Sequence, residues 1–191
     1  MPSLPALLVI DMQNALMRIA HRPGPTVAAI AGLSERARAA GVPVVTVRQG
    51  DEELVPGTEG WCVVPELAPR EGEKVLDKTT PDSFLGTDLD GALRALGVTE
   101  VIVTGFATEV CVDTTARQAL SRGYDLVVVA DGHTTSLRGE EDVDLVPADR
   151  SIAQCNAIYR TIGWPGRRIR VRAAADVDFP GPERAGGLTP A

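Results

Sequence analysis

Residues 100–123, EVIVTGFATEVCVDTTARQALSRG, contain the strand-loop-helix unit that decides the fold. Residues 100–104 (EVIVT) are rich in β-branched side chains, which is typical of a buried strand, and a loop with the sequence GFATE follows them. Residues 110–120 predict a helix, and Gly123 lies just beyond its end, where glycine commonly terminates helices. The unit therefore places Cys111 in the first turn of a helix, near the carboxyl end of a strand.

The same alternation extends in both directions along the chain. We predict helices over residues 26–40, 88–96 and 148–162, and further strands over residues 5–11, 42–47, 74–78, 125–130 and 168–171. Alternating strands and helices favour right-handed crossovers and a parallel sheet that is covered on both faces. The sequence thus predicts an α/β, Rossmann-like three-layer sandwich with a mostly parallel six-stranded sheet. Residues 48–69 lack periodicity and predict a long loop, which is a candidate wall or lid of a pocket.

Composition narrows the functional classes. The 191 residues are 44% hydrophobic with a formal charge of −7, which fits one globular domain over residues 1–175 and a Pro/Gly-rich tail over 176–191. The acidic balance argues against nucleic-acid binding. No apolar run reaches the roughly 18 residues that a membrane-spanning helix needs. Three separated cysteines, Cys62, Cys111 and Cys155, favour reduced thiols and a cytoplasmic location.

Chemically active side chains stand at the ends of three predicted strands. Asp11 ends the first strand, Lys78 follows the third, and Cys111 follows the fourth. Because the carboxyl ends of parallel strands meet at one edge, we expect the three to lie together. A helix N-terminus favours a thiolate, so Cys111 is the predicted nucleophile. Asp11 would be the general base, and Lys78 would stabilise the ionised form or orient the carboxylate. Taken singly, each could instead be a turn cap, a solvated charge or a packed thiol.

Four segments carry a resemblance to a known family. They are LLVIDMQNAL (7–16), DKTTPDSFLGTDLD (77–90), VTGFATEVCVDTTARQAL (103–120) and GYDLVVVADGHTT (123–135). From about residue 7 to 171 the chain resembles the isochorismatase-like cysteine hydrolases, which include nicotinamidases and N-carbamoylsarcosine amidohydrolase. The resemblance implies the isochorismatase-like hydrolase fold and a catalytic triad of Asp11, Lys78 and Cys111. It also implies a cis peptide bond between Phe106 and Ala107, and an oxyanion hole formed by the amides of Ala107 and Cys111. Thr108 is expected to support that loop by hydrogen bonding.

The loop after the second strand departs from the metal-binding members of that family. Those members carry an acid and several histidines there, whereas residues 48–61 (RQGDEELVPGTEGW) contain no histidine. We therefore expect no metal, no cofactor and a substrate other than nicotinamide. Asp51, Glu52 and Glu53 could recruit a hard cation, but we interpret them as a solvated acidic loop. Gln49, Trp61 and Phe84 are expected either to line the substrate pocket or to pack.

Together, the residues and the resemblance predict a hydrolase acting on a small amide-like molecule. The C–N bond of an amide, ureide, carbamoyl compound or lactam would be cleaved through an acyl-enzyme on Cys111. One alternative is an isochorismatase-type vinyl-ether hydrolase, which relies on an acid in place of a thiol. Another is a non-catalytic or redox-sensing domain on the same scaffold. Since relatives in this family commonly form homodimers or homotetramers, we expect a homo-oligomer.

Overall fold

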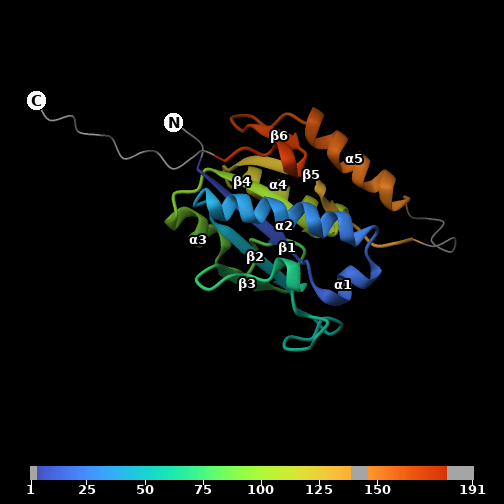
Figure 1. Cartoon of the computed structure of the whole chain (residues 1–191). Helices are drawn as coiled ribbons and strands as arrows, with labels where there is room; N and C mark the ends of the chain where they lie inside the picture. The colour runs from blue at the N-terminus through green and yellow to red at the C-terminus, as the bar shows by residue number, and fades with distance from the viewer. Residues whose placement is uncertain (1–3, 139–145, 180–191) are drawn as a thin grey trace, which may run out of the picture.

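The computed structural model describes residues 4–138 and 146–179 (Figure 1). A six-stranded sheet runs through the middle, with every strand pair parallel and the order β3-β2-β1-β4-β5-β6. The strands are β1 (Pro5–Ile10), β2 (Val44–Gln49), β3 (Lys74–Lys78), β4 (Glu100–Phe106), β5 (Asp125–Thr134) and β6 (Ile169–Arg172). The order reverses between β1 and β4, which is where ligands bind in open parallel sheets.

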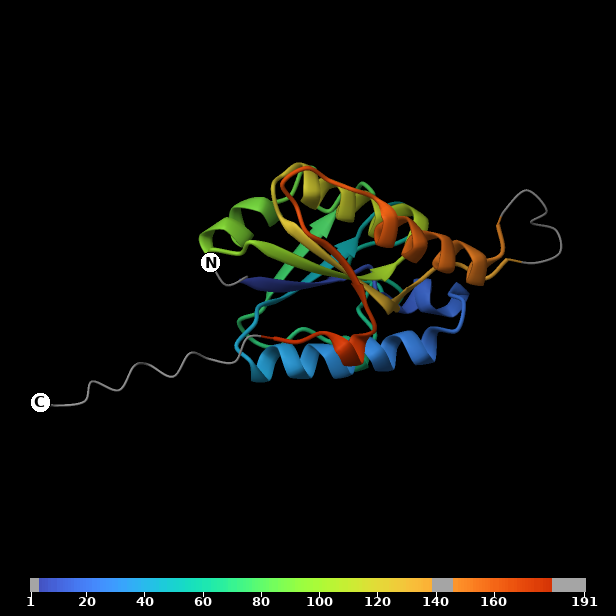
Figure 2. The same cartoon turned by 90° about the horizontal axis from the view of Figure 1, so that it is seen from above.

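Helices cover both faces of the sheet, which confirms the predicted three-layer α/β architecture. The α-helices are α1 (Asn14–Ile19), α2 (Pro23–Ala39), α3 (Leu89–Ala95), α4 (Asp113–Ser121) and α5 (Ala148–Thr161). Shorter helical turns are η1 (Pro65–Leu67), the π-helical η2 (Thr108–Val112) and η3 (Ala174–Asp176). Figure 2 shows α2 on one side of the sheet and α4 and α5 on the other. Among the described residues, none of these helices is both long and apolar enough to cross a bilayer.

Strand β1 contributes to the apolar cores on both faces of the sheet, and all six of its residues are buried. Successive side chains of a strand point to opposite faces. Accordingly Leu8 and Ile10 join the core beneath α3, α4 and α5, while Leu7 and Val9 join the core beneath α2. A run without polar positions is what a central parallel strand requires, since neither face meets water. The buried apolar run therefore defines β1, and Asp11 is the first residue after it.

Several boundaries differ from the sequence predictions. Helix α1 was not predicted, and β2 reaches Gln49, so Gln49 lies in a strand and not in the following loop. Strand β5 continues to Thr134, four residues beyond its predicted end at 130. Val177 is buried in the core and Phe179 packs against it, so the packed domain extends past residue 175. Residues 180–191 of the predicted tail and residues 139–145 lie outside the described part of the chain.

Gly105 explains how the ends of β1 and β4 come so close. Its φ of +130° is a conformation that side-chain-bearing residues rarely adopt. A Cβ at this position would lie 2.1 Å from the carbonyl oxygen of Ile10, which is far inside van der Waals contact. The absence of a side chain lets the backbone of β4 press against the residue that precedes Asp11. The segment after β4, which carries Cys111, is thereby brought beside the end of β1.

Candidate active site

Asp11 and Lys78 form a buried ion pair at the carboxyl edge of the sheet. Lys78 Nζ lies 2.7 Å from Asp11 Oδ2, and the two side chains are 0% and 1% exposed. Asp11 follows β1 with a left-handed φ of +52°, and its amide donates to the carbonyl of Val47 at 2.8 Å. Among the described residues, the second carboxylate oxygen, Oδ1, is buried without a hydrogen-bond partner. Asp11 thus keeps one free acceptor inside the protein.

Cys111 completes the group that the strand ends predicted. Its Sγ lies 3.3 Å from Lys78 Nζ, so one ammonium group contacts both the thiol and the carboxylate. Cys111 is the fourth residue of the π-helical turn η2 and is only partly buried. The prediction had placed it in the first turn of an α-helix. Cys111 does lie in the first turn of this helical segment, but that turn is π-helical and runs directly into α4, which begins at Asp113.

Two glutamines hold the lysine in place. Gln49 Oε1 accepts a hydrogen bond from Lys78 Nζ at 2.7 Å. Gln13 is fully buried; its amide nitrogen donates to the carbonyls of Gln49 and Trp61, and its amide oxygen accepts from the Gln49 N–H, each at 2.9 Å. Gln13 therefore clamps the end of β2 and aims Gln49 at the lysine. Sequence reasoning missed Gln13, although it lies in the DMQ segment that carried the resemblance.

Phe84 and Trp61, the other two candidate pocket residues, both make packing contacts. Phe84 is 5% exposed in the core, where its ring stacks on Tyr124 with centroids 6.2 Å apart and Arg122 covers it. Of the two roles expected for Phe84, the structure therefore supports packing. The Trp61 ring carries the guanidinium of Arg48, 3.8 Å from its centroid, and Arg48 also pairs with Asp77. Trp61 thus contacts Arg48, which in turn pairs with Asp77, the residue before Lys78.

The turn before Cys111 contains the atoms that the resemblance assigns to an oxyanion hole. The peptide bond between Phe106 and Ala107 is cis, at the position that the resemblance implies. The carbonyl of Ala107 accepts hydrogen bonds from the amides of Val110 and Val112 at 3.0 and 3.2 Å. These bonds close the chain into a compact turn that has Ala107 at its start and Cys111 within it.

Comparison with known proteins identifies the family. The isochorismatase domain model matches residues 5–155, which is most of the chain. The chain belongs to the isochorismatase family. A solved structure of an isochorismatase from Pseudomonas putida KT2440 superposes with a TM-score of 0.77 at 27% identity, covering 93% of this chain and 94% of that one.

Curated relatives include proteins with named activities. An isochorismatase family protein of Bacillus subtilis, YddQ, is 35% identical over 82% of this chain and 94% of its own. Streptothricin hydrolase of Streptomyces noursei is 39% identical over 76% of this chain and 56% of its own. The ureidoacrylate amidohydrolase RutB of Methylobacterium radiotolerans is 33% identical, covering 68% and 67%. The family is therefore one of hydrolases whose named substrates differ.

The electrostatics of this isochorismatase-family site correct one expectation. Burial, and then the carboxylate of Asp11, raise the pKa of the Cys111 thiol to about 12, although Lys78 acts in the opposite direction. The prediction of a thiol acidified by a helix N-terminus is therefore wrong for the free protein. Burial also raises the pKa of the Asp11 carboxyl, and the neighbouring Lys78 offsets part of this effect. The free protein thus holds Cys111 as a neutral thiol.

This protonation state predicts the order in which the cysteines are alkylated. Iodoacetamide reacts with thiolates, so in native protein at pH 8 we expect exposed Cys62 to be labelled before half-buried Cys111. Labelling of Cys111 should accelerate as the pH rises towards its pKa of about 12. Peptide mass spectrometry after limited labelling measures the order, and urea-unfolded protein, in which all three cysteines react alike, is the control. Faster labelling of Cys111 in the native state would contradict the raised pKa.

The acidic loop after β2 is ordered by its own hydrogen bonds. Asp51 Oδ1 accepts from the amides of Glu53 and Leu54 at 2.9 and 2.8 Å, and Oδ2 accepts from Gln49 Nε2 at 3.1 Å. This is the turn-capping role that short acidic side chains often play. Within residues 4–138 and 146–179, no group of three or more His, Cys, Asp or Glu side chains is arranged to bind a metal ion.

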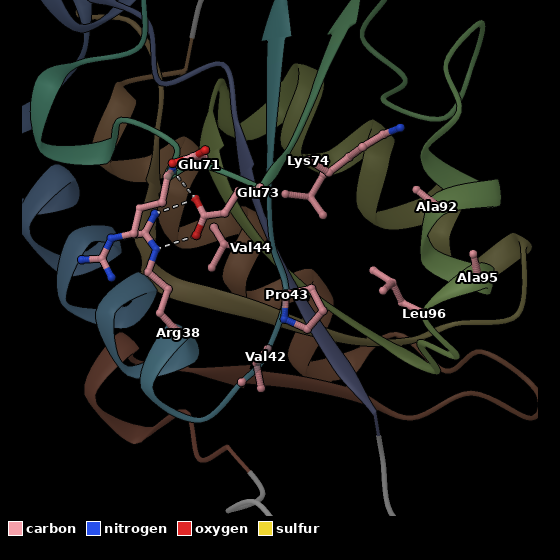
Figure 3. Close-up of a pocket in the computed structure, with 14 residues that line it drawn as sticks. Arg38, Val42, Pro43, Val44, Glu71, Glu73, Lys74, Ala92, Ala95 and Leu96 are labelled. Carbon is pink, nitrogen blue, oxygen red and sulfur yellow. Dashed lines mark hydrogen bonds and ion pairs between the residues drawn. The ribbon is translucent and has the colours of Figure 1, made fainter.

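A hollow lies at the opposite edge of the sheet, near the amino ends of its strands, and is separate from the site. Figure 3 shows that it is lined by residues near the amino ends of β2 and β3 and by α3. Two of its charged side chains pair with each other: Arg38 donates to both carboxylate oxygens of Glu73 at 2.7 and 2.9 Å. The labelled apolar residues are Val42, Pro43, Val44, Ala92, Ala95 and Leu96. Asp11, Lys78 and Cys111 lie at the carboxyl ends of the strands, so this hollow does not form part of their site.

Proposed function

We propose that this protein is a cysteine hydrolase that cleaves a C–N bond of a small amide, ureide, carbamoyl compound or lactam through an acyl-enzyme on Cys111. One observation carries the proposal: Lys78 Nζ lies within 3.3 Å of the thiol sulfur and 2.7 Å of the Asp11 carboxylate. A nucleophile, a base and a cation are thus within contact of each other in a largely dehydrated site, which is what nucleophilic acyl transfer requires.

The first half of the reaction forms a thioester. Cys111 Sγ would attack the substrate carbonyl carbon while the thiol proton moves to Asp11, whose Oδ1 is otherwise unpaired among the described residues. The negative charge that develops on the carbonyl oxygen would be met by the amides of Ala107 and Cys111. When the C–N bond breaks, the protonated Asp11 would return the proton to the leaving nitrogen, and ammonia or an amine departs.

The second half regenerates the thiol. Asp11, again ionised, would take a proton from water as the water oxygen attacks the thioester carbon. The C–S bond then breaks, and the proton returns to Cys111. Since the pKa of Cys111 is about 12, the thiolate is a strong base and is readily reprotonated. Lys78 would stabilise the negative charge as it passes between carboxylate and sulfur, and Gln49 would keep the ammonium group in reach.

The named relatives support the substrate class. RutB is named an amidohydrolase, and it aligns over 68% of this chain. Streptothricin hydrolase is a second hydrolase of the same family. Both the site and these relatives are therefore consistent with an amide or ureide substrate.

A vinyl-ether hydrolase of the isochorismatase type is the second candidate, and one observation favours it. Burial raises the pKa of the Asp11 carboxyl, which favours the protonated acid that this reaction needs. Such a mechanism would not use the thiol. Cys111, held 3.3 Å from Lys78, would then have no chemical role, which is why we prefer the acyl-enzyme.

A substrate panel tests the proposal. Purified protein is incubated with primary amides, ureido acids, N-carbamoyl compounds, lactams and a vinyl ether, and the release of amine or ketone is measured. We expect amine release, and acid-quenched reactions should show an acyl adduct on the peptide that contains Cys111. Vinyl-ether cleavage without an adduct would favour the second candidate. Absence of turnover across the panel would favour a non-catalytic role.

A further inference from the structure

His133 is a buried imidazole that the proposed mechanism does not use. It lies near the end of β5, is 2% exposed and pairs in register with Gly105 of β4. Both ring nitrogens have partners: Nδ1 lies 2.9 Å from the Thr108 hydroxyl, and Nε2 lies 3.2 Å from Asn156 Oδ1. Thr108 and Asn156 are themselves 0% and 6% exposed. The imidazole thus connects α5 to the turn that carries Cys111.

The hydrogen-bond directions in this chain follow from Asn156. Its amide nitrogen donates to the carbonyl of Ala130 at 3.0 Å, so its oxygen must be the atom that faces His133. That oxygen can only accept, and therefore His133 Nε2 carries the proton. Burial lowers the pKa of His133, so the ring is neutral and Nδ1 has a free lone pair. The Thr108 hydroxyl must then donate to Nδ1.

Thr108 is the residue through which this chain reaches the reactive turn. It is the first residue of η2 and directly follows Ala107, whose carbonyl organises the turn by accepting from Val110 and Val112. The next residue of the turn is also held, since Thr135, which directly follows β5, donates to the Glu109 carboxylate at 2.9 Å. The end of β5 and the residue that follows it therefore hold two successive residues of the turn.

We propose that His133, acting through Thr108, is a positioning residue for the amides of Ala107 and Cys111. This inference rests on the proposed acyl-transfer function, because those amides matter only if an oxyanion forms. Donors of an oxyanion hole are effective when they are fixed before charge develops. A neutral imidazole that can only accept at Nδ1 holds the hydroxyl, and with it the start of the turn, in one orientation.

Matched variants at Thr108 test the role in catalysis. Thr108→Val keeps the shape and removes the donor, whereas Thr108→Ser keeps the donor. With a substrate from the panel, we expect Thr108→Val to lower kcat by about 10- to 100-fold, the loss typical of a slight misplacement of catalytic groups, with KM little changed. Thr108→Ser should stay within about threefold of the parent kcat, because its hydroxyl still donates. Unchanged kcat in Thr108→Val, or equal losses in both variants, would overturn the proposal.

A second variant tests the link to His133. His133→Leu should lower kcat as Thr108→Val does, and the double variant should be little worse than either single one, because both changes break the same contact. Fully additive losses would contradict a shared path. If His133→Leu does not fold, the Thr108 pair still decides the question.

Two measurements on the free protein separate this inference from the proposed function. Nitrogen-15 NMR of the imidazoles should show His133 protonated at Nε2 and bare at Nδ1, with His21 as the internal comparison. Thr108→Val should also shift the amide resonances of Ala107 and Cys111 and speed their hydrogen exchange. A proton on Nδ1, or unchanged amides, would overturn the positioning role whatever the substrate. The expected NMR results without turnover of any panel compound would instead reject the proposed function alone.

Discussion

Cys111→Ala should lower kcat by about 10⁴-fold or more on any amide substrate, because no thioester can form without the sulfur. Asp11→Asn should reduce kcat by about 10²- to 10⁴-fold, since the amide keeps the shape of the side chain but cannot accept the thiol proton. The double variant should be little worse than Cys111→Ala, because the two residues act in one step. Steady-state kinetics of the three variants measure these losses.

The chain offers a matched control for this prediction. Cys62 is an exposed cysteine in the loop after β2, so Cys62→Ala should keep near-native turnover. Circular dichroism of each variant checks that the fold is retained. If Cys111→Ala kept its activity while Asp11→Asn lost it, the acyl-enzyme mechanism would be wrong and acid-driven cleavage of a vinyl ether would replace it.

Lys78→Met should cost about 3 to 5 kcal/mol of unfolding free energy at pH 8, because it leaves the Asp11 carboxylate buried without its cation. The pKa of Asp11 is already raised by burial, and loss of Lys78 removes the largest opposing influence. The folded variant should therefore bind a proton more tightly than the unfolded chain does. Its stability should fall as pH rises, so the deficit should be smaller at pH 5 than at pH 8.

Urea unfolding at the two pH values measures this effect. Lys74→Met, on the same strand, is the control: Lys74 is exposed and lies 3.6 Å from exposed Asp88, and loss of such a surface pair changes stability by about 1 kcal/mol or less. Adding Asp11→Asn to Lys78→Met should restore part of the lost stability at pH 8, because no buried charge remains. Equal stabilities of Lys78→Met and Lys74→Met at both pH values would contradict the buried pair.

Periodicity and strand ends were sufficient to predict much of the site. An apolar run that ends at Asp11 and a short predicted strand that ends at Lys78 marked the carboxyl edge of the sheet, and the strand-loop-helix unit placed Cys111 there. These signals come from residues that are neighbours in the chain, so they can be recognised in a single sequence. The six-residue helix α1 escaped prediction because it is too short to show a helical period.

The contacts of Gln13 and His133 could not be predicted in the same way. Gln13 reaches residues 36 and 48 positions away, and His133 bridges residues that come 25 positions before it and 23 after it. Nothing near either residue in the sequence names its partners. Whether Phe84 lines the pocket or packs could not be decided from the sequence either, because its packing neighbour Tyr124 comes from a distant segment.

The sequence by itself determined the alternation of strands with the longer helices, the parallel sheet and the edge at which Asp11, Lys78 and Cys111 gather, because those follow from local hydrophobic patterns. Only the tertiary structure decided that the ammonium group of Lys78 contacts both partners and that the thiol of Cys111 rests in its neutral form. A thiol's charge depends on the water removed around it and on the carboxylate brought beside it, and packing of distant segments sets both.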